Sequence, residues 1–234
     1  MSSSNWLSFN ESVTSRFSFT IPGAPEKESP ECESALREPM PLKTPWTLWE
    51  QVATGSYSTS KVCTFHTAQQ FWSVWNGVPQ PSELLENKRF FREQTNGPPL
   101  SIDALMIFRE GIEPQWEDEA NAKGGHFQIQ LKPAAGGGQI DEYWNNLVLA
   151  MIGETMDCGH HVTGVRLVDK LSGKGKVTDA IRLELWYHSK ATDAEIKTLR
   201  KSVEKILITR LDNSQGTGFK PDAMQDKKHT AYGK

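Results

Sequence analysis

The sequence predicts one α+β domain built on a single antiparallel sheet with helices on one side. Two stretches, 126–132 and 180–188, alternate apolar and polar residues with the period of a strand. Three further stretches repeat apolar residues every three or four positions, which is the period of a helix. The run LSGKGK (171–176) separates two strand-like segments and is typical of a hairpin turn.

The chain divides into three parts by composition. Residues 1–40 are rich in Ser, Pro and Glu without a sustained period, so we expect a flexible N-terminal tail. The folded domain is expected over 41–212 and begins with a strand in PWTLWEQV (45–52). Residues 213–234 are mildly basic and are predicted to form a mobile C-terminal tail.

Three helices follow from caps and periodicity. The first is predicted to begin at Thr67, where Thr67 and Gln70 have the spacing of a capping box. The second is expected over 141–152, where a broad apolar face ends at a glycine. The third begins with a second capping box, formed by Thr192 and Glu195. The GGG run before the second helix (136–138) is expected to be a loop.

The strand over 180–188 predicts a ligand-binding face. Its alternate residues Ile181, Leu183, Leu185 and Tyr187 suit a core. The opposite face carries Arg182, Glu184 and Trp186, and a bulky aromatic on an otherwise solvated face indicates a ligand. The segment 162–168 is predicted to be the neighbouring strand.

Composition excludes several classes of protein. The longest apolar run, 147–152, is far shorter than the ~18 residues of a membrane span. The N-terminus has no secretory pattern, and three widely spaced cysteines favour a reducing compartment, so we expect a cytoplasmic protein, with some nuclear presence possible. A net charge of −3 without a polybasic run argues against gripping long nucleic-acid backbones, but it permits recognition of a single nucleotide.

The segment GIEPQWEDE (111–119) is the most informative motif. It places Trp116 beside Glu117, Asp118 and Glu119 on an irregular loop. An aromatic face attracts positive charge, and a carboxylate accepts charge-assisted hydrogen bonds, so the pair suits a flat cationic ligand such as a charged purine. The alternative is a tryptophan that anchors the loop beside a solvated acidic run.

Cations near the ligand face suit a phosphate chain. Arg182 lies four residues before Trp186 on the same strand face, and Lys170, Lys174 and Lys176 lie in or beside the preceding turn. The alternative is a solvated hairpin with scattered lysines. No nucleophile–base pair is evident, and CGHH (158–161) lacks a second Cys/His cluster for a zinc site, so we expect no enzyme, no cofactor and no metal.

Five ordered blocks resemble the eukaryotic translation initiation factor 4E family. They are PWTLW (45–49), FW (71–72), GIEPQWEDE with GGHF (111–127), YWNNLVLAMIGE (143–154) and LELW (183–186). The resemblance implies a curved antiparallel sheet of about eight strands with three helices on its convex face. It also implies that the concave face binds the 7-methylguanosine cap of mRNA, with the cap-proximal nucleotides nearby.

The resemblance assigns roles to individual residues. Trp116 resembles a stacking tryptophan, Glu117 the carboxylate that pairs with guanine, and Trp186 the residue against the N7-methyl group. Lys170 and Arg182 occupy the positions of the phosphate contacts. The loop 50–61 is short and has no tryptophan where the family has its other stacking residue, so we predict that Tyr57 takes this role.

The resemblance also implies a protein partner on the convex face. The partner would be a scaffold initiation factor of the 4G type, or a 4E-binding repressor, that docks an amphipathic helix. The matching positions are Met40, Pro41, Ala68, Trp72, Asn145 and Leu149.

The predicted function is therefore to bind capped mRNA and to recruit it to a scaffold for translation initiation. One alternative is a translational regulator of the same fold with weak or altered cap affinity. A second, from another class, is a metal-dependent cap or nucleotide hydrolase that uses the acidic run 117–119.

Overall fold

The computed structural model describes residues 38–53, 57–87, 89–94, 96–171, 179–210, 214–216, 220 and 223–229. The predicted N-terminal tail therefore lies almost entirely outside the described residues, as do Lys174 and Lys176. The strands are β1 (Pro41–Val52), β2 (Thr59–Thr67), β3 (Phe90–Arg92), β4 (Leu100–Arg109), β5 (Gly125–Leu131), β6 (Val162–Asp169), β7 (Ile181–Tyr187) and β8 (Gln225–Lys228). The helices are α2 (Ala68–Trp75), α3 (Glu83–Asn87), α4 (Gly137–Ile152) and α5 (Asp193–Ile208), with short 3-10 helices η1 (Pro133–Ala135) and η2 (Gly159–His161).

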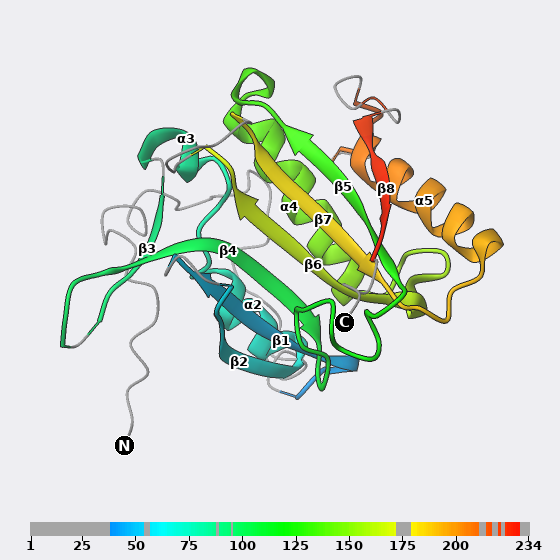
Figure 1. The fold of residues 1–234 in the computed structure, drawn as a ribbon, viewed down its shortest axis with the longest axis horizontal. Helices are drawn as coiled ribbons and strands as arrows, with labels where there is room; N and C mark the ends of the chain where they lie inside the picture. The colour runs from blue at the N-terminus through cyan, green and yellow to red at the C-terminus, as the bar shows by residue number, and fades with distance from the viewer. Residues whose placement is uncertain are drawn as a thin grey trace, which may run out of the picture.

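All eight strands belong to one antiparallel sheet. Their order is β2-β1-β4-β6-β7-β5-β8, and β3 pairs with β4 outside this path. Figure 1 shows α2 and α4 behind the sheet, with α5 along the side that carries β8. The predicted fold class is confirmed: the three expected helices are α2, α4 and α5, and the short α3 is an addition. In the part of the chain that the structure describes, no helix is long and apolar enough to cross a membrane.

The helix starts follow the predicted caps. The Thr67 side chain accepts a hydrogen bond from the Gln70 backbone N–H, and the Gln70 side chain accepts one from the N–H of His66. Thr192 and Glu195 form the full reciprocal capping box at α5. These bonds satisfy backbone groups that a helix start leaves without partners, so they fix where each helix begins.

Helix α4 begins earlier than predicted. The expected start was residue 141, with GGG (136–138) as a loop, but the helix begins at Gly137 and Gly136 is its N-cap. A Cβ on Gly137 would lie 2.9 Å from the Cβ of Ser82, so the first turn packs too closely on the neighbouring segment for a side chain. Of the three glycines that suggested a loop, Gly137 allows this close packing, and Gly136 adopts the positive φ of +85° at the N-cap.

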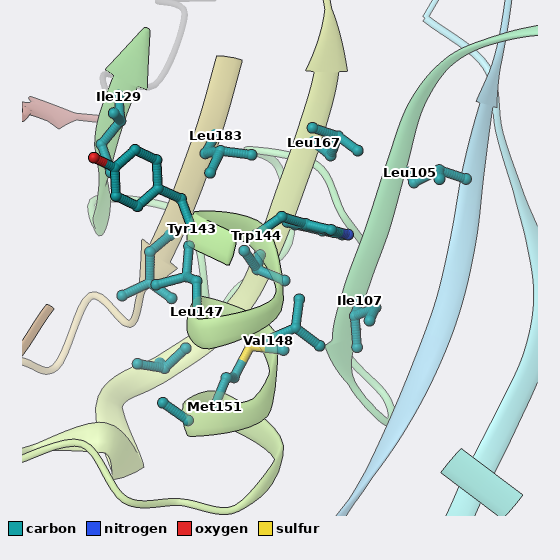
Figure 2. Close-up of a cluster of buried hydrophobic side chains, with 14 of the residues drawn as sticks. Leu105, Ile107, Ile129, Tyr143, Trp144, Leu147, Val148, Met151, Leu167 and Leu183 are labelled. Carbon is teal, nitrogen blue, oxygen red and sulfur yellow. The ribbon is translucent and has the colours of Figure 1, made fainter. Parts of the chain in front are cut away.

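The main core lies between α4 and the sheet. Trp144 is fully buried at its centre. Figure 2 shows it with Leu147, Val148 and Met151 of α4, which face Leu105, Ile107, Ile129, Leu167 and Leu183 of four strands. An indole of this size buries on the order of 200 Å², so it is a large part of what holds the helix against the sheet.

A second, smaller cluster lies on the opposite face of the sheet. It contains Ala104, Met106, Phe108, Val168 and Trp186, with Trp49 and Ile112 packed against it. Residues 181, 183, 185 and 187 of β7 belong to the main core. The predicted assignment of alternate β7 residues to two faces is therefore correct, and the face with Trp186 is the one away from α4.

Part of the expected C-terminal tail is built into the sheet. The sequence predicted a mobile tail over 213–234, but Gln225–Lys228 form β8, which pairs with β5 from Gly125 to Gln128. Asp226 also accepts a hydrogen bond from the Tyr187 hydroxyl at 2.6 Å. Every β8 side chain is exposed, so QDKK lacks the alternation of apolar and polar residues that marks a strand. The sequence pattern therefore did not reveal β8.

The packing at Gly164 leaves no room for a larger side chain between β6 and the cluster that contains Trp186. A Cβ at this position would lie 2.4–2.6 Å from the Phe108 ring on the paired strand β4. We expect Gly164→Ala to lower the free energy of unfolding by about 1–3 kcal/mol, as overpacking does. Chemical denaturation of the full chain measures this loss.

Gly138→Ala is the matched control. It lies in α4, and a Cβ added at this position would have nothing within 4 Å. Alanine is the better helix former, so this variant should be about as stable as the parent or up to about 1 kcal/mol more stable. Equal stability of the Gly164→Ala variant and the parent would contradict the packing argument.

Candidate functional site

A cavity of about 410 Å³ opens on the sheet face that carries Trp186. Its lining comes from four separate segments: Tyr57 from the β1–β2 connection, Gln115, Trp116 and Glu117 from the β4–β5 connection, Arg166 from β6 and Trp186 from β7. Three aromatic rings, a carboxylate and a guanidinium thus meet in one space. A cavity of this size suits a small ligand such as a nucleotide.

The loop that presents Trp116 is held by its own side chains. The Asp118 carboxylate accepts hydrogen bonds from the backbone N–H groups of Glu113 and Ala120, each at 2.9 Å. The buried Asn121 amide donates to the carbonyls of Glu113 and Gln115. These bonds fix the backbone of the loop that carries the Trp116 ring, which is 36% exposed, and the exposed Glu117 carboxylate.

Trp186 forms the floor of the cavity. Only 1% of its surface is exposed, and it packs edge-on against Phe108 with ring centroids 5.3 Å apart. Its indole N–H donates to the Glu184 carboxylate at 3.0 Å. The ring therefore reaches the cavity with a small part of its surface, and its orientation is fixed by packing on one side and by a hydrogen bond on the other.

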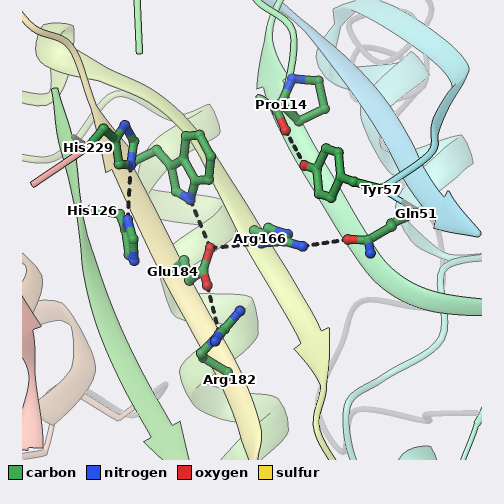
Figure 3. Close-up of polar contacts among 9 residues, drawn as sticks. Gln51, Tyr57, Pro114, His126, Arg166, Arg182, Glu184 and His229 are labelled. Carbon is green, nitrogen blue, oxygen red and sulfur yellow. Dashed lines mark hydrogen bonds and ion pairs between the residues drawn. The ribbon is translucent and has the colours of Figure 1, made fainter. Parts of the chain in front are cut away.

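Glu184 is a buried carboxylate beneath the cavity, and two arginines compensate its charge. Arg182 Nε lies 2.7 Å from one oxygen, and Arg166 lies 3.4 Å from the other, the oxygen that also accepts from Trp186 (Figure 3). Burial by itself would raise the pKa of Glu184, but Arg166 and Arg182, with the hydrogen bond from Trp186, hold that pKa below its usual value. Glu184 is thus ionised, and it anchors both cations and the indole.

Tyr57 bridges two walls of the cavity. Its hydroxyl donates to the carbonyl of Pro114, which belongs to the loop that presents Trp116 (Figure 3). Arg166 lies over the Tyr57 ring at 5.5 Å from its centroid and donates to the Gln51 side chain. Half of the tyrosine surface is exposed. The contacts hold the ring at the cavity although it comes from a different connection.

His229 supports Trp116 from outside the cavity. Its ring stacks on Trp116 with centroids 5.4 Å apart and planes 18° apart, and it contacts Trp186 at 4.5 Å. Its Nδ1 donates to the Asn121 carbonyl at 2.8 Å, so its Nε2 accepts from Nδ1 of His126 at 3.0 Å (Figure 3). Burial lowers the pKa of both histidines, that of His126 to about 4, so both rings are neutral near pH 7.

The predicted ligand residues separate into two groups. Tyr57, Trp116, Glu117 and Trp186 meet at the cavity as expected. Lys170 and Arg182 are not part of its lining: Arg182 lies deeper on β7 beside Glu184, and Lys170 directly follows β6. Arg182 therefore lies on the same sheet face as the cavity but outside its lining.

Sequence reasoning missed Arg166, Gln115 and His229. Arg166 alternates with the core residues Val165 and Leu167 on β6, so strand periodicity could have placed it on the ligand face. His229 had no such signal, because its position depends on β8 pairing with β5 about 100 residues away in the chain.

The predicted partner residues gather near α2 and the start of β1. Met40 is 54% exposed and Trp72 is 45% exposed, and the carbonyl of Met40 accepts from the backbone N–H of Ala68 at 2.8 Å. Pro41 is exposed, and Leu149 of α4 is half-buried. Asn145 instead bonds internally, accepting from the Trp75 indole and donating to Gln80 and the Asp141 carbonyl, so its amide helps to hold α4 to the neighbouring segments.

The acidic run 117–119 does not form a three-ligand cluster. Among the described residues, the group of histidine, cysteine or acidic side chains close enough to share a metal ion is His160, His161 and Glu195. Both carboxylate oxygens of Asp118 accept hydrogen bonds from backbone N–H groups of its own loop. The geometry therefore gives no support to the hypothesis of a metal-dependent hydrolase centred on this run.

Comparisons with known proteins agree with this geometry. The chain is 30% identical over 217 residues to eukaryotic translation initiation factor 4E-1 of Citrullus lanatus, covering 89% of this chain and 80% of the relative. It is 39% identical over 123 residues to the Saccharomyces cerevisiae factor 4E, covering half of each chain. Among solved structures, it resembles Ascaris suum initiation factor 4E-3 in complex with an m2,2,7G cap, with a TM-score of 0.57, 26% identity, and coverage of 73% of this chain and 85% of that one.

A sequence profile described as Eukaryotic initiation factor 4E matches residues 41–234, which include the whole sheet, the cavity and β8. With the identity to the watermelon relative over most of both chains, this match shows that the chain belongs to the eukaryotic initiation factor 4E family.

Proposed function

We propose that this protein binds the 7-methylguanosine cap of mRNA in the cavity between Tyr57 and Trp116 and recruits the mRNA for translation initiation. The observation that carries the proposal is the meeting of three aromatic rings and the Glu117 carboxylate in one 410 Å³ cavity. Family membership and the cap bound by the Ascaris suum relative support it.

Charge explains how such a cavity would select a methylated cap. Methylation at N7 gives guanine a positive charge, and a cation against an aromatic face gains up to about 2 kcal/mol when it is desolvated. The His229 ring that stacks on Trp116 is neutral near pH 7, so it places no positive charge against that indole. Unmethylated guanine lacks the charge and should bind more weakly.

Glu117 and two nearby cations would recognise the guanine edge and the phosphates of the cap. The exposed carboxylate of Glu117 can accept from N1–H and the N2 amine of guanine, a donor pair that adenine lacks. Arg182 lies on the same sheet face and Lys170 follows β6, and we propose that these two cations contact the phosphates. Because Arg182 is paired with the buried Glu184, its position is fixed before a ligand arrives.

The opposite side of the sheet suits a protein partner. We propose that the surface formed by Met40, Pro41, Trp72 and Leu149 receives an amphipathic helix of a 4G-type scaffold or a 4E-binding repressor. The exposed Trp72 ring and Met40 are large apolar side chains of the kind that anchor such interfaces.

We further propose that the protein acts without catalysis and in the cytoplasm.

A titration with cap analogues tests the central proposal. We expect 7-methyl-GTP to quench tryptophan fluorescence and to bind at least tenfold more tightly than GTP, because only the methylated base is cationic. Trp116→Ala should weaken 7-methyl-GTP binding by about 30-fold or more, since it removes about 2 kcal/mol of stacking and cation–π energy. Trp75→Phe, on the other side of the sheet, is the control and should leave affinity unchanged. Equal affinity for GTP and 7-methyl-GTP would rule out the proposal.

Tyr57 variants separate the ring from its hydroxyl. Tyr57→Phe keeps the ring but loses the bond to the Pro114 carbonyl, so we expect 7-methyl-GTP affinity to fall about three- to tenfold. Tyr57→Ala loses both and should fall further. The same titration with a trimethylated cap tests whether this wall sets the preference among methylated caps. If Tyr57→Ala binds as tightly as the parent, Tyr57 is not a stacking residue.

Trp72 variants test the partner surface. Trp72→Ala should weaken binding of a 4G-type scaffold fragment by at least tenfold, because the surface loses its exposed apolar anchor. Its affinity for 7-methyl-GTP should stay within twofold, since the ring lies on the helix-covered side. Ser73→Ala, the exposed neighbour on α2, is the matched control. Calorimetry with both ligands checks this, and unchanged scaffold affinity for Trp72→Ala would contradict the assignment.

A further inference from the structure

We propose that His160, His161 and Glu195 form a binding site for a divalent first-row metal ion, with Zn²⁺ as the best match. The two histidines belong to η2, and the glutamate lies in the first turn of α5. One ligand atom from each residue lies within 4.8 Å of the other two. Neither the cap cavity nor the proposed partner surface includes these residues.

The distances suit shared coordination. His161 Nε2 and a Glu195 oxygen are 3.1 Å apart. Two ligands at about 2.1 Å from one zinc ion, at a tetrahedral angle, lie roughly 3.4 Å from each other. The pair is therefore already close to one edge of a zinc tetrahedron. His160 is exposed, and its ligand atom lies within 4.8 Å of the other two, so we infer that a change of its side-chain rotamer would complete the third position.

The supporting bonds hold the first two ligands in place. The second Glu195 oxygen accepts from the Thr192 N–H at 2.9 Å and from the Thr192 hydroxyl at 2.7 Å, which leaves the first oxygen directed at His161. The His161 backbone is held on both sides, since its N–H donates to Cys158 and its carbonyl accepts from His188. Such second contacts orient metal ligands and raise affinity.

The donor set favours zinc over magnesium or calcium. Two imidazoles and one carboxylate are the ligands of several zinc sites that keep a fourth position for water, whereas Mg²⁺ and Ca²⁺ prefer oxygen ligands alone. The sequence offered only the two adjacent histidines, and Glu195 joins them because α5 begins beside η2. The competing explanation for this cluster is an ion pair between His161 and Glu195 alone. In that case His160 would not contribute to binding.

Calorimetric titration of the full chain with Zn²⁺ tests the site. We expect one ion to bind, and His160→Ala and Glu195→Gln each to weaken binding at least tenfold. Glutamine serves as well as glutamate at this position of a capping box, so Glu195→Gln should fold normally. Because His160 is exposed, its variant should fold normally too. His66→Ala, which removes an exposed histidine on β2, is the matched control and should bind like the parent.

A second measurement identifies the ligands. Co²⁺ should bind with a visible spectrum typical of nitrogen and oxygen ligands, and Zn²⁺ should raise the melting temperature of the parent but not of Glu195→Gln. Absence of binding, or equal binding by parent and both variants, would overturn the proposal. A thiolate-to-cobalt absorption band that disappears in Cys158→Ser would also overturn it, because the donor set would then be different.

Discussion

The buried carboxylate of Glu184 is the interaction on which the ligand side of this protein depends. A lone carboxylate at this depth would be strongly destabilising, so it requires compensation from cations and hydrogen-bond donors. Arg166, Arg182 and the Trp186 indole supply it. Two of these partners are thereby fixed at the cavity: Arg166 lies over the Tyr57 ring, and Trp186 forms the floor. The third, Arg182, lies beside Glu184 on the same strand, where we propose that it contacts the phosphates.

The cavity is organised before a ligand arrives because its walls are tied to one another. Tyr57 bonds to the loop that presents Trp116, and His229 stacks behind that tryptophan. The loop itself is held by Asp118 and Asn121. Ordering side chains on binding costs conformational entropy. Because these contacts already order the side chains in the folded protein, less entropy is lost when a ligand binds. A tyrosine at position 57 adds a hydroxyl tether that a tryptophan, which lacks a hydroxyl, would not make in the same way.

The sheet also separates the two proposed functions. Side chains alternate across each strand, so residues 182, 184 and 186 of β7 serve the ligand face while 181, 183 and 185 pack against the helices. Gly164 lets Phe108 lie flat against β6 and support Trp186. The partner surface near Trp72 lies across this packed layer. Coupling between the two faces would therefore have to pass through a core that tolerates little movement.

Local chemistry in the sequence determined most of the elements, the two faces of β7 and three cavity residues, Trp116, Glu117 and Trp186. Tyr57 was predicted only from the family resemblance. Helix caps at Thr67 and Thr192, the alternation in β7 and the GIEPQWEDE loop each depend on neighbours within a few residues, so the chain alone reveals them. The tertiary structure decided what depends on distant segments meeting. Tyr57 reaches Pro114 across 57 positions and His126 reaches His229 across 103. No local period records such contacts, because they follow from how β1, β5 and β8 are arranged in one sheet.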